Sequence, residues 1–88
     1  MTTTATVQVT VRFFAAARAA AGNEVVTIRI QRATTVGELV DQLSRRDTNL
    51  AKVLMRCSYL RDGIAVRDLG TTLSDGQTVD VLPPFAGG

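Results

Sequence analysis

The stretch VQVTVRF, residues 7–13, alternates apolar and polar side chains, and this alternation decides how the rest of the chain can fold. Successive side chains of a strand point to opposite faces, so one face of this strand is apolar. The residues of that face are Val7, Val9, Val11 and Phe13. The stretch TVDVL, residues 78–82, repeats the pattern with Val79 and Val81. Both stretches predict half-buried strands, and we expect the last strand to lie centrally in a sheet beside the first.

The residues that follow the first strand predict helices and a second strand. An alanine-rich run over 14–22 favours a short helix of one or two turns, with Gly22 as its C-terminal stop. Residues 26–30 alternate again and predict a strand. Thr35 and Glu38 have the spacing of a capping box, and the apolar residues after them recur at helical spacing. We therefore predict an amphipathic helix over 36–46.

The second half of the chain predicts shorter elements. Residues 50–54 predict a further short turn of helix, and residues 57–61 predict a strand. The dipeptide Asp-Gly at 62–63 is typical of a two-residue hairpin turn, after which the chain returns as a short strand over 64–66. The sequence LSDG at 73–76 predicts a turn, and we expect a tight helical turn directly before it.

Elements in this order predict an α+β fold, with the helices on one side of a mixed sheet. We expect one β-grasp domain over residues 1–82, in which four to five strands curl round one main helix. Residues 1–5 are expected to fray. A length of 88 residues leaves no room for a second domain.

The composition excludes several classes of function. The net charge is only +2 and the ten basic residues are spread along the chain, which argues against nucleic-acid binding. No apolar stretch is long enough to cross a membrane. With no histidine and one cysteine, Cys57, we expect neither a zinc cluster nor an intramolecular disulfide, and we expect a cytoplasmic protein. Cys57 is either a small buried hydrophobe or a sulfur-carrying thiol.

The strand pattern stops after residue 82, and the chain continues as PPFAGG over residues 83–88. Pro83 and Pro84 have no backbone N–H, so they cannot extend a central ladder, and their fixed φ keeps the chain extended. The two terminal glycines lack a Cβ, which makes the end thin. Residues 83–88 are thus expected to form an extended, flexible tail with a reach of roughly 20 Å.

Two interpretations of this tail stay open at this point. The first is a frayed terminus. The second is a probe that enters a narrow tunnel in a partner, where Phe85 fills an apolar pocket and the α-carboxylate of Gly88 is the reactive group. The prolines and the phenylalanine favour the probe, because a tail that only frays needs neither.

Together these stretches resemble the MoaD family, ubiquitin-like sulfur carriers that form the small subunit of molybdopterin synthase. The resemblance runs from residue 7 to residue 88, and its most specific part is the Pro-Pro-x-x-Gly-Gly ending. It rests on VRFFAAAR at 11–18, TVGEL at 35–39, LSDG at 73–76 and LPPFAGG at 82–88. The chain departs from the family at LRDG, residues 60–63, where the family often has Val-Asn before the turn.

The resemblance implies a function for the tail. An E1-like adenylyltransferase would use ATP to adenylate the carboxylate of Gly88, and a sulfur donor protein would convert the adenylate to a thiocarboxylate. The tail would then enter the large subunit of the synthase and donate sulfur to cyclic pyranopterin monophosphate (precursor Z). The sheet face near the last strand would dock the large subunit together with Phe85. The partner-binding residues of the tail would be Pro83, Pro84, Phe85, Ala86 and Gly87.

The resemblance also implies that the chain is not catalytic alone and binds no cofactor of its own. It would be the sulfur-donating subunit of a heterotetramer, with two small subunits at the ends of a large-subunit dimer. Three alternatives stay open. The chain can carry sulfur for thiamine or cysteine synthesis, or it can be a protein modifier whose Gly88 is joined to a lysine of a target. It can also be a β-grasp interaction module without terminal chemistry.

Overall fold

The computed structural model describes residues 5–84 of the chain. The fold is built from five strands and three helices. In chain order they are β1 (Thr6–Phe13), α1 (Ala15–Ala21), β2 (Val25–Gln31), α2 (Val36–Ser44), α3 (Thr48–Leu54), β3 (Ser58–Arg61), β4 (Ile64–Ala65) and β5 (Thr78–Leu82). In this part of the chain no helix is both long enough and apolar enough to span a membrane.

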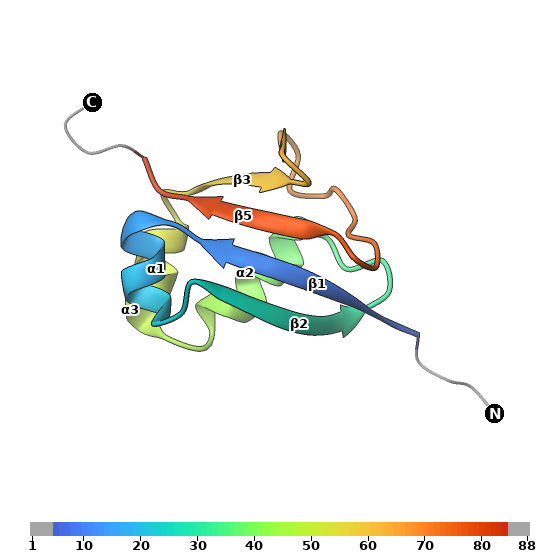
Figure 1. Ribbon diagram of the computed structural model, residues 1–88, viewed down its shortest axis with the longest axis horizontal. Helices are drawn as coiled ribbons and strands as arrows, with labels where there is room; N and C mark the ends of the chain where they lie inside the picture. The colour runs from blue at the N-terminus through green and yellow to red at the C-terminus, as the bar shows by residue number, and fades with distance from the viewer. Residues whose placement is uncertain (1–4, 85–88) are drawn as a thin grey trace.

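The strands form one mixed sheet in the order β2-β1-β5-β3-β4. The first strand, β1, runs parallel to the last strand, β5, and all other neighbouring strands are antiparallel. Figure 1 shows α2 crossing behind the sheet, with α1 and α3 at the end where β1 and β5 finish. The predicted β-grasp fold is confirmed, including the central position of the last strand beside the first.

The core lies between the sheet and the helices and follows the predicted alternation. It is made of aliphatic side chains from both layers, each at most 3% exposed. They include Val9, Val11, Val79 and Val81 from the sheet and Leu39, Leu43, Leu50 and Leu54 from the helices. Burying a side chain of this kind contributes about 1.5–3 kcal/mol to the stability of the fold. The packed core therefore holds the strands, and with them the strand ends, in fixed positions.

The capping box at the start of α2 is confirmed, but the helix is shorter than predicted. The Thr35 Oγ1 accepts from the Glu38 N–H at 3.1 Å, and the Glu38 Oε1 accepts from the Thr35 N–H at 2.9 Å. The helix ends at Ser44 and not at residue 46, because Asp47 is needed as the N-cap of α3, where its Oδ1 accepts from the Asn49 N–H at 2.9 Å. Residues 48–54 accordingly form a seven-residue helix where only a short turn was predicted.

The loop before β5 corrects another prediction. No helix directly precedes Leu73; the chain instead makes a single hydrogen-bonded turn at residues 69–70, in which the Thr71 N–H donates to the Asp68 carbonyl at 3.0 Å. Carbonyl groups of this loop accept the first N–H groups of α2: the Val36 N–H bonds the Thr71 oxygen, and the Gly37 N–H bonds the Leu69 oxygen, each at 2.9 Å. The first turn of a helix leaves such donors unpaired, so pairing with them holds the loop against the start of α2.

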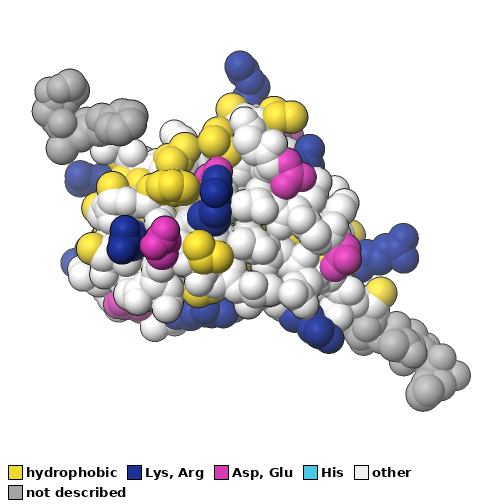
Figure 2. Space-filling model, in the orientation of Figure 1, with side chains coloured by type: hydrophobic (Ala, Val, Ile, Leu, Met, Phe, Trp, Pro, Cys, Tyr) yellow, Lys and Arg dark blue, Asp and Glu magenta, His cyan; other side chains and the backbone are white. Residues whose placement is uncertain are grey.

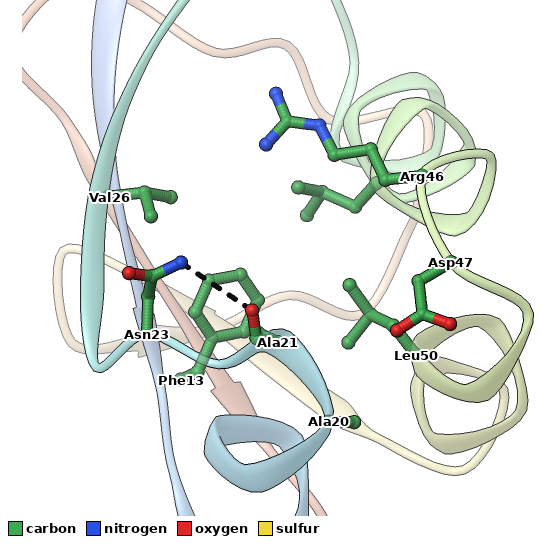
Figure 3. A pocket seen from close by; sticks show the side chains of 9 residues that line it. Phe13, Ala20, Ala21, Asn23, Val26, Arg46, Asp47 and Leu50 are labelled. Carbon is green, nitrogen blue, oxygen red and sulfur yellow. Dashed lines mark hydrogen bonds between the residues drawn. The ribbon is translucent and has the colours of Figure 1, made fainter.

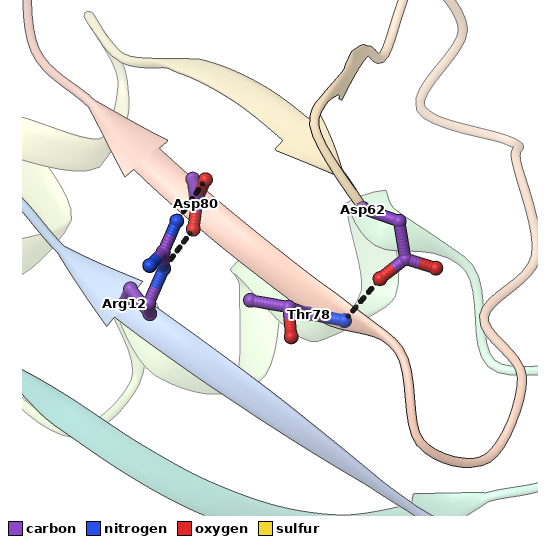
Figure 4. Close-up of polar contacts among 4 residues, drawn as sticks. All are labelled: Arg12, Asp62, Thr78 and Asp80. Atoms are coloured by element: carbon purple, nitrogen blue, oxygen red, sulfur yellow. Dashed lines mark hydrogen bonds and ion pairs between the residues drawn. The ribbon is translucent and has the colours of Figure 1, made fainter.

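The predicted hairpin between β3 and β4 is confirmed. Asp62 and Gly63 have φ values of 50° and 82°, the left-handed pair of a two-residue hairpin turn. The strand before the turn begins at Ser58, so Cys57 is not part of it. The Asp62 Oδ1 also accepts from the Thr78 N–H at 2.8 Å, which joins the hairpin to the start of β5 (Figure 4).

Candidate functional site

The candidate site is the place where the chain leaves the sheet after β5. At the end of this strand Val81 pairs with Phe13 of β1, and Leu82 pairs with Ser58 of β3. Pro83 is therefore the first residue beyond both neighbouring strands, and its missing N–H costs no ladder hydrogen bond. The fold thus explains why the prolines stand where they do.

The structure places two of the predicted site residues. Pro83 is half-buried against the fold and Pro84 is exposed. The other predicted site residues, Phe85, Ala86, Gly87 and Gly88, lie outside the described residues. Their roles stay predictions from the sequence.

An ion pair crosses from β1 to β5 on the outer face of the sheet beside this site. The Arg12 Nε donates to the Asp80 Oδ1 at 2.6 Å, and its Nη2 donates to the Oδ2 at 2.8 Å (Figure 4). Asp80 is only 6% exposed, so the two-pronged contact supplies the partner that a buried carboxylate needs. These hydrogen bonds raise the pKa of Arg12 above its already high ordinary value, which keeps the guanidinium charged.

Apolar side chains surround the ion pair on the same face. In the sheet register Asp80 lies opposite Leu60, Leu60 lies opposite Ala65, and Leu82 lies opposite Ser58, so their side chains share the outer face. Figure 2 shows apolar side chains gathered over β5 and β3 on this face. We call Phe14, Leu60, Ala65 and Leu82 the outer apolar stripe.

Phe14 lies on this face because its backbone is still extended, so its side chain points to the same side as that of Arg12, two residues earlier. The Phe14 N–H donates to the Val81 carbonyl at 3.2 Å, and the next residue, Ala15, has a φ of 51°. A residue with a Cβ adopts this left-handed conformation only at an energetic cost. The turn leaves Phe14 38% exposed, with the Arg12 guanidinium 5.5 Å from the centre of its ring.

Sequence reasoning missed this ion pair, although a signal was present. Arg12 is the only charged residue of β1, and Asp80 is the only charged residue of β5. Two opposite charges in two strands that are expected to be neighbours, and on the polar side of both alternations, predict a cross-strand pair once the parallel register is known.

Cys57 is placed as a structural residue. Its side chain is half-buried against the core, and its Sγ contacts the Val53 carbonyl oxygen at 3.2 Å. Burial raises the pKa of the Cys57 thiol above its ordinary value, which disfavours the reactive thiolate. The structure therefore favours the buried-hydrophobe interpretation over a sulfur-carrying thiol.

A small pocket of about 200 Å³ lies between α1, β2 and the α2–α3 connection (Figure 3). Core side chains form its floor, while Asn23, Arg46 and Asp47 lie at its edge. Two of these polar groups already have partners, because Asp47 caps α3 and the Asn23 side-chain amide donates to the Ala21 carbonyl at 3.5 Å. Neither Pro83 nor Pro84 lines this pocket, so we do not include it in the candidate site.

Metal-binding groups do not gather in the described structure. Across residues 5–84 no three residues of the types His, Cys, Asp and Glu lie close enough together to hold a metal ion. The described site offers a charged pair and an apolar surface beside the origin of the C-terminal segment, and these are features through which a partner can be recognised.

Comparison with known proteins shows similarity over most of the chain. The ThiS family matches residues 11–88. Small archaeal modifier protein 3 of Haloferax volcanii is 31% identical over an alignment of 87 positions, which covers 88% of this chain and 95% of that protein.

Solved structures show the same similarity. The solution structure of a Haloferax volcanii protein has a TM-score of 0.83 at 32% identity, and covers 94% of this chain and 88% of that one. A chain of the complex of subunits 1 and 2 of the molybdopterin-converting factor from Helicobacter pylori has a TM-score of 0.67 at 28% identity. That match covers 92% of this chain and 99% of that one.

Proposed function

Because the chain belongs to the ThiS family of ubiquitin-like sulfur carriers, we propose that it carries sulfur as a thiocarboxylate on Gly88 for molybdenum cofactor synthesis. In this role it is the small subunit of molybdopterin synthase and donates sulfur to cyclic pyranopterin monophosphate. The observation that carries the proposal is the family match, which runs through the Pro-Pro-x-x-Gly-Gly ending directly after the central strand β5.

The proposed chemistry takes place at the α-carboxylate of Gly88. A carboxylate is a poor acyl donor, because its oxygen is a poor leaving group. An E1-like partner joins this carboxylate to the AMP portion of ATP and releases pyrophosphate. Sulfide-level sulfur released by a sulfur donor protein then forms a bond to the acyl carbon while the C–O bond to AMP breaks. This leaves a thiocarboxylate whose sulfur is the nucleophile for the pterin precursor. The chain binds no cofactor in this scheme, and ATP is used by the activating partner.

The fold has a role in this chemistry through positioning. The strand before the tail, β5, pairs on both sides, so the point from which the tail starts is fixed in the sheet. A reagent held on a guided segment has a high effective concentration at its acceptor. We therefore assign the acid–base groups of the reaction to the large subunit, and the supply and placement of sulfur to this chain.

We assign the outer apolar stripe, with the Arg12–Asp80 pair at its centre, to docking the large subunit. Aromatic and arginine side chains are the most frequent anchors of such interfaces, and the stripe offers Phe14 and Arg12. The Helicobacter pylori protein was solved in complex with a second subunit, which supports a partner of this kind. Two small subunits at the ends of a large-subunit dimer, in the cytoplasm, complete the proposal.

The test is the mass of the C-terminal tryptic peptide, residues 68–88, from protein purified out of its native cell. This peptide contains neither methionine nor cysteine, so oxidation cannot imitate the exchange of oxygen for sulfur. A sulfur-for-oxygen shift on Gly88 that increases by the mass of one alkyl group after alkylation is the expected result. An unmodified Gly88, even after incubation with ATP, an activating enzyme and a sulfur source, would contradict the proposal.

A second candidate function is protein modification, and one observation favours it. The 31% identical relative from Haloferax volcanii is a small archaeal modifier protein by name. The same adenylated Gly88 would then be attacked by the ε-amine of a target lysine, which forms an isopeptide bond and releases AMP. Isopeptide-linked adducts of high mass in cells would distinguish this function, and reconstitution with each acceptor enzyme separates the molybdopterin pathway from thiamine or cysteine synthesis.

A further inference from the structure

A groove of about 670 Å³ lies beside the origin of the C-terminal segment. One wall is formed by Pro83 and Pro84, and another by α3 and the residues that follow it. Ala16, at the start of α1, completes the apolar lining. The groove contains no residue of the outer apolar stripe, so it is a separate surface at the same end of the molecule.

Both charged residues that line the groove are basic. Lys52 lies in the last turn of α3, and Arg56 follows one helical turn later on the same side as Asn49 and Val53. The ion pairs of residues 5–84 join Arg12 to Asp80, Arg18 to Glu24 and Arg45 to Asp41, so neither groove cation takes part in one there. The groove therefore presents positive charge to whatever enters it.

The apolar part of the groove is suited to an adaptable contact. Met55 is 86% exposed, next to the half-buried Val53. A methionine side chain is flexible and polarisable, and it adjusts to the shape of an apolar partner. Positive charge around an apolar surface matches a segment in which an apolar side chain stands between carboxylates.

We propose that this groove is a second docking surface, which binds an acidic segment with an apolar side chain on the protein that receives the tail. The proposal rests on the proposed function in one respect, that a partner protein takes in residues 83–88. Pro83 and Pro84 are both a wall of the groove and the start of that segment, so a protein that encloses the segment also covers the groove. The partner would then hold the origin of the tail from two sides, which fixes its direction.

The test measures the Kd between the full chain and the large subunit of the synthase from the same organism, by calorimetry at two salt concentrations. The groove variant is Lys52→Glu/Arg56→Glu. The charge-matched control is Arg29→Glu/Arg32→Glu, two exposed residues in and just after β2, an edge strand of the sheet. The conservative variant is Lys52→Arg/Arg56→Lys, and thermal unfolding of each variant shows that it is folded.

We expect the groove variant to bind about tenfold or more weakly and with a smaller salt dependence, because two attractive contacts become repulsive. The control is expected to change Kd less than about twofold, since exposed charges away from an interface contribute little. The conservative variant should bind like the unchanged protein. A groove variant that binds as tightly as the control would overturn the proposal.

If the unchanged chain does not bind the large subunit, that result contradicts only the proposed function. A separate measurement then tests whether the groove binds an acidic segment. The ¹⁵N-labelled chain is titrated with a short synthetic peptide of alternating glutamate and leucine. Shifts of the amide signals of residues 49–56 that are lost in the groove variant support the proposal, and their absence overturns it. If deleting residues 85–88 moves the same signals without peptide, the groove binds the chain's own end, which also overturns it.

Discussion

The two ends of β5 differ in how their polar groups are used. At the start of the strand the chain pairs with itself: the Thr78 N–H donates to the Asp62 carboxylate and the Thr10 N–H to the Gln77 carbonyl, at 2.8 and 3.0 Å. At the other end the described chain continues as two prolines between an apolar stripe and a basic groove. Figure 4 shows the Asp62–Thr78 contact at the start of this strand and the Arg12–Asp80 pair at its middle residue.

This difference separates stability from recognition within a single strand. Hydrogen bonds that are satisfied inside the chain at the start of β5 hold the sheet together and offer little to a partner. The end of the strand carries groups that an interface could still use. Changes at the start should therefore alter the free energy of unfolding, and changes at the end should alter binding and sulfur transfer.

The largest expected effect comes from deleting Gly88. The proposed thiocarboxylate can then no longer form on Gly88, so we expect sulfur transfer in the reconstituted synthase to be abolished. The melting temperature should stay the same, because the buried core of the described residues ends at Val81, seven positions before Gly88. The measurement is molybdopterin formation beside thermal unfolding of the same sample. Molybdopterin formation that persists in the deletion variant would contradict the expected difference between the two ends of β5.

The next effect is expected for Phe14→Ala on the outer apolar stripe. An aromatic anchor that fills a desolvated pocket contributes roughly 1–3 kcal/mol to association, and we expect a loss of this size for the large subunit. Phe14 is 38% exposed in the free chain, so stability should change by less than about 1 kcal/mol. Calorimetric titration and chemical denaturation check the two numbers. The sequence predicts a loss of the same size for Phe85→Ala, and no loss in either variant would remove the anchor role.

At the start of β5 we expect the opposite pattern for Asp62→Ala. This change removes the acceptor of the Thr78 N–H and places alanine at a φ of 50°. The free energy of unfolding should fall by about 1–2 kcal/mol, while the Kd for the large subunit stays unchanged. Asp62→Asn is the matched control, since it keeps an acceptor and tolerates this φ. Weaker binding of a folded Asp62→Ala protein would contradict the separation.

The smallest effect is expected at Tyr59, whose hydroxyl donates to the Leu54 carbonyl at 2.8 Å under the sheet. Burial, followed by the nearby Cys57, raises the pKa of Tyr59 above its ordinary value of 10.0. A group whose pKa is raised by folding stabilises the protein below its unfolded pKa and loses this contribution as the pH rises. Stability should therefore fall above pH 10.0, and Cys57, with a pKa raised above 9.0, adds to the fall from pH 9.0 upward.

Tyr59→Phe should cost about 1 kcal/mol at neutral pH, because the hydrogen bond to Leu54 is lost. It should also reduce the loss of stability at alkaline pH, since the buried phenol is gone. Denaturation at pH 7 and pH 11 gives both values. If the variant loses as much stability between pH 7 and pH 11 as the unchanged protein, groups other than Tyr59 cause the loss at alkaline pH.

The parts of this fold that depend on local patterns could be predicted from the sequence. The alternation of β1 and β5, the capping box of Thr35 and Glu38, and the Asp-Gly hairpin all concern neighbouring residues, and each was confirmed. The loop before β5 follows a course that was not predicted. It is held by the first turn of α2, more than 30 residues earlier in the chain.

Only the part of the candidate site that is continuous in the sequence could be predicted. The Pro-Pro-x-x-Gly-Gly ending is read directly, whereas the Arg12–Asp80 pair requires a parallel register between residues 68 positions apart. The groove requires even more, because α3, the start of α1 and the two prolines meet only after the helices pack. Surfaces assembled from distant segments are fixed by packing, which a local pattern does not contain.

The parallel pairing of β1 with β5 has a consequence for how the protein is made. The central strand of the sheet is also the last strand to be synthesised, and its hydrogen-bonding partner is the first. Such distant pairing slows folding, because a long loop of chain has to close before any contact stabilises it. On the ribosome the sheet cannot be completed until β5 has emerged from the exit tunnel. The sheet therefore forms only after all five strands have been made, and a partner that recognises the paired β1 and β5 binds only chains in which this pairing is complete.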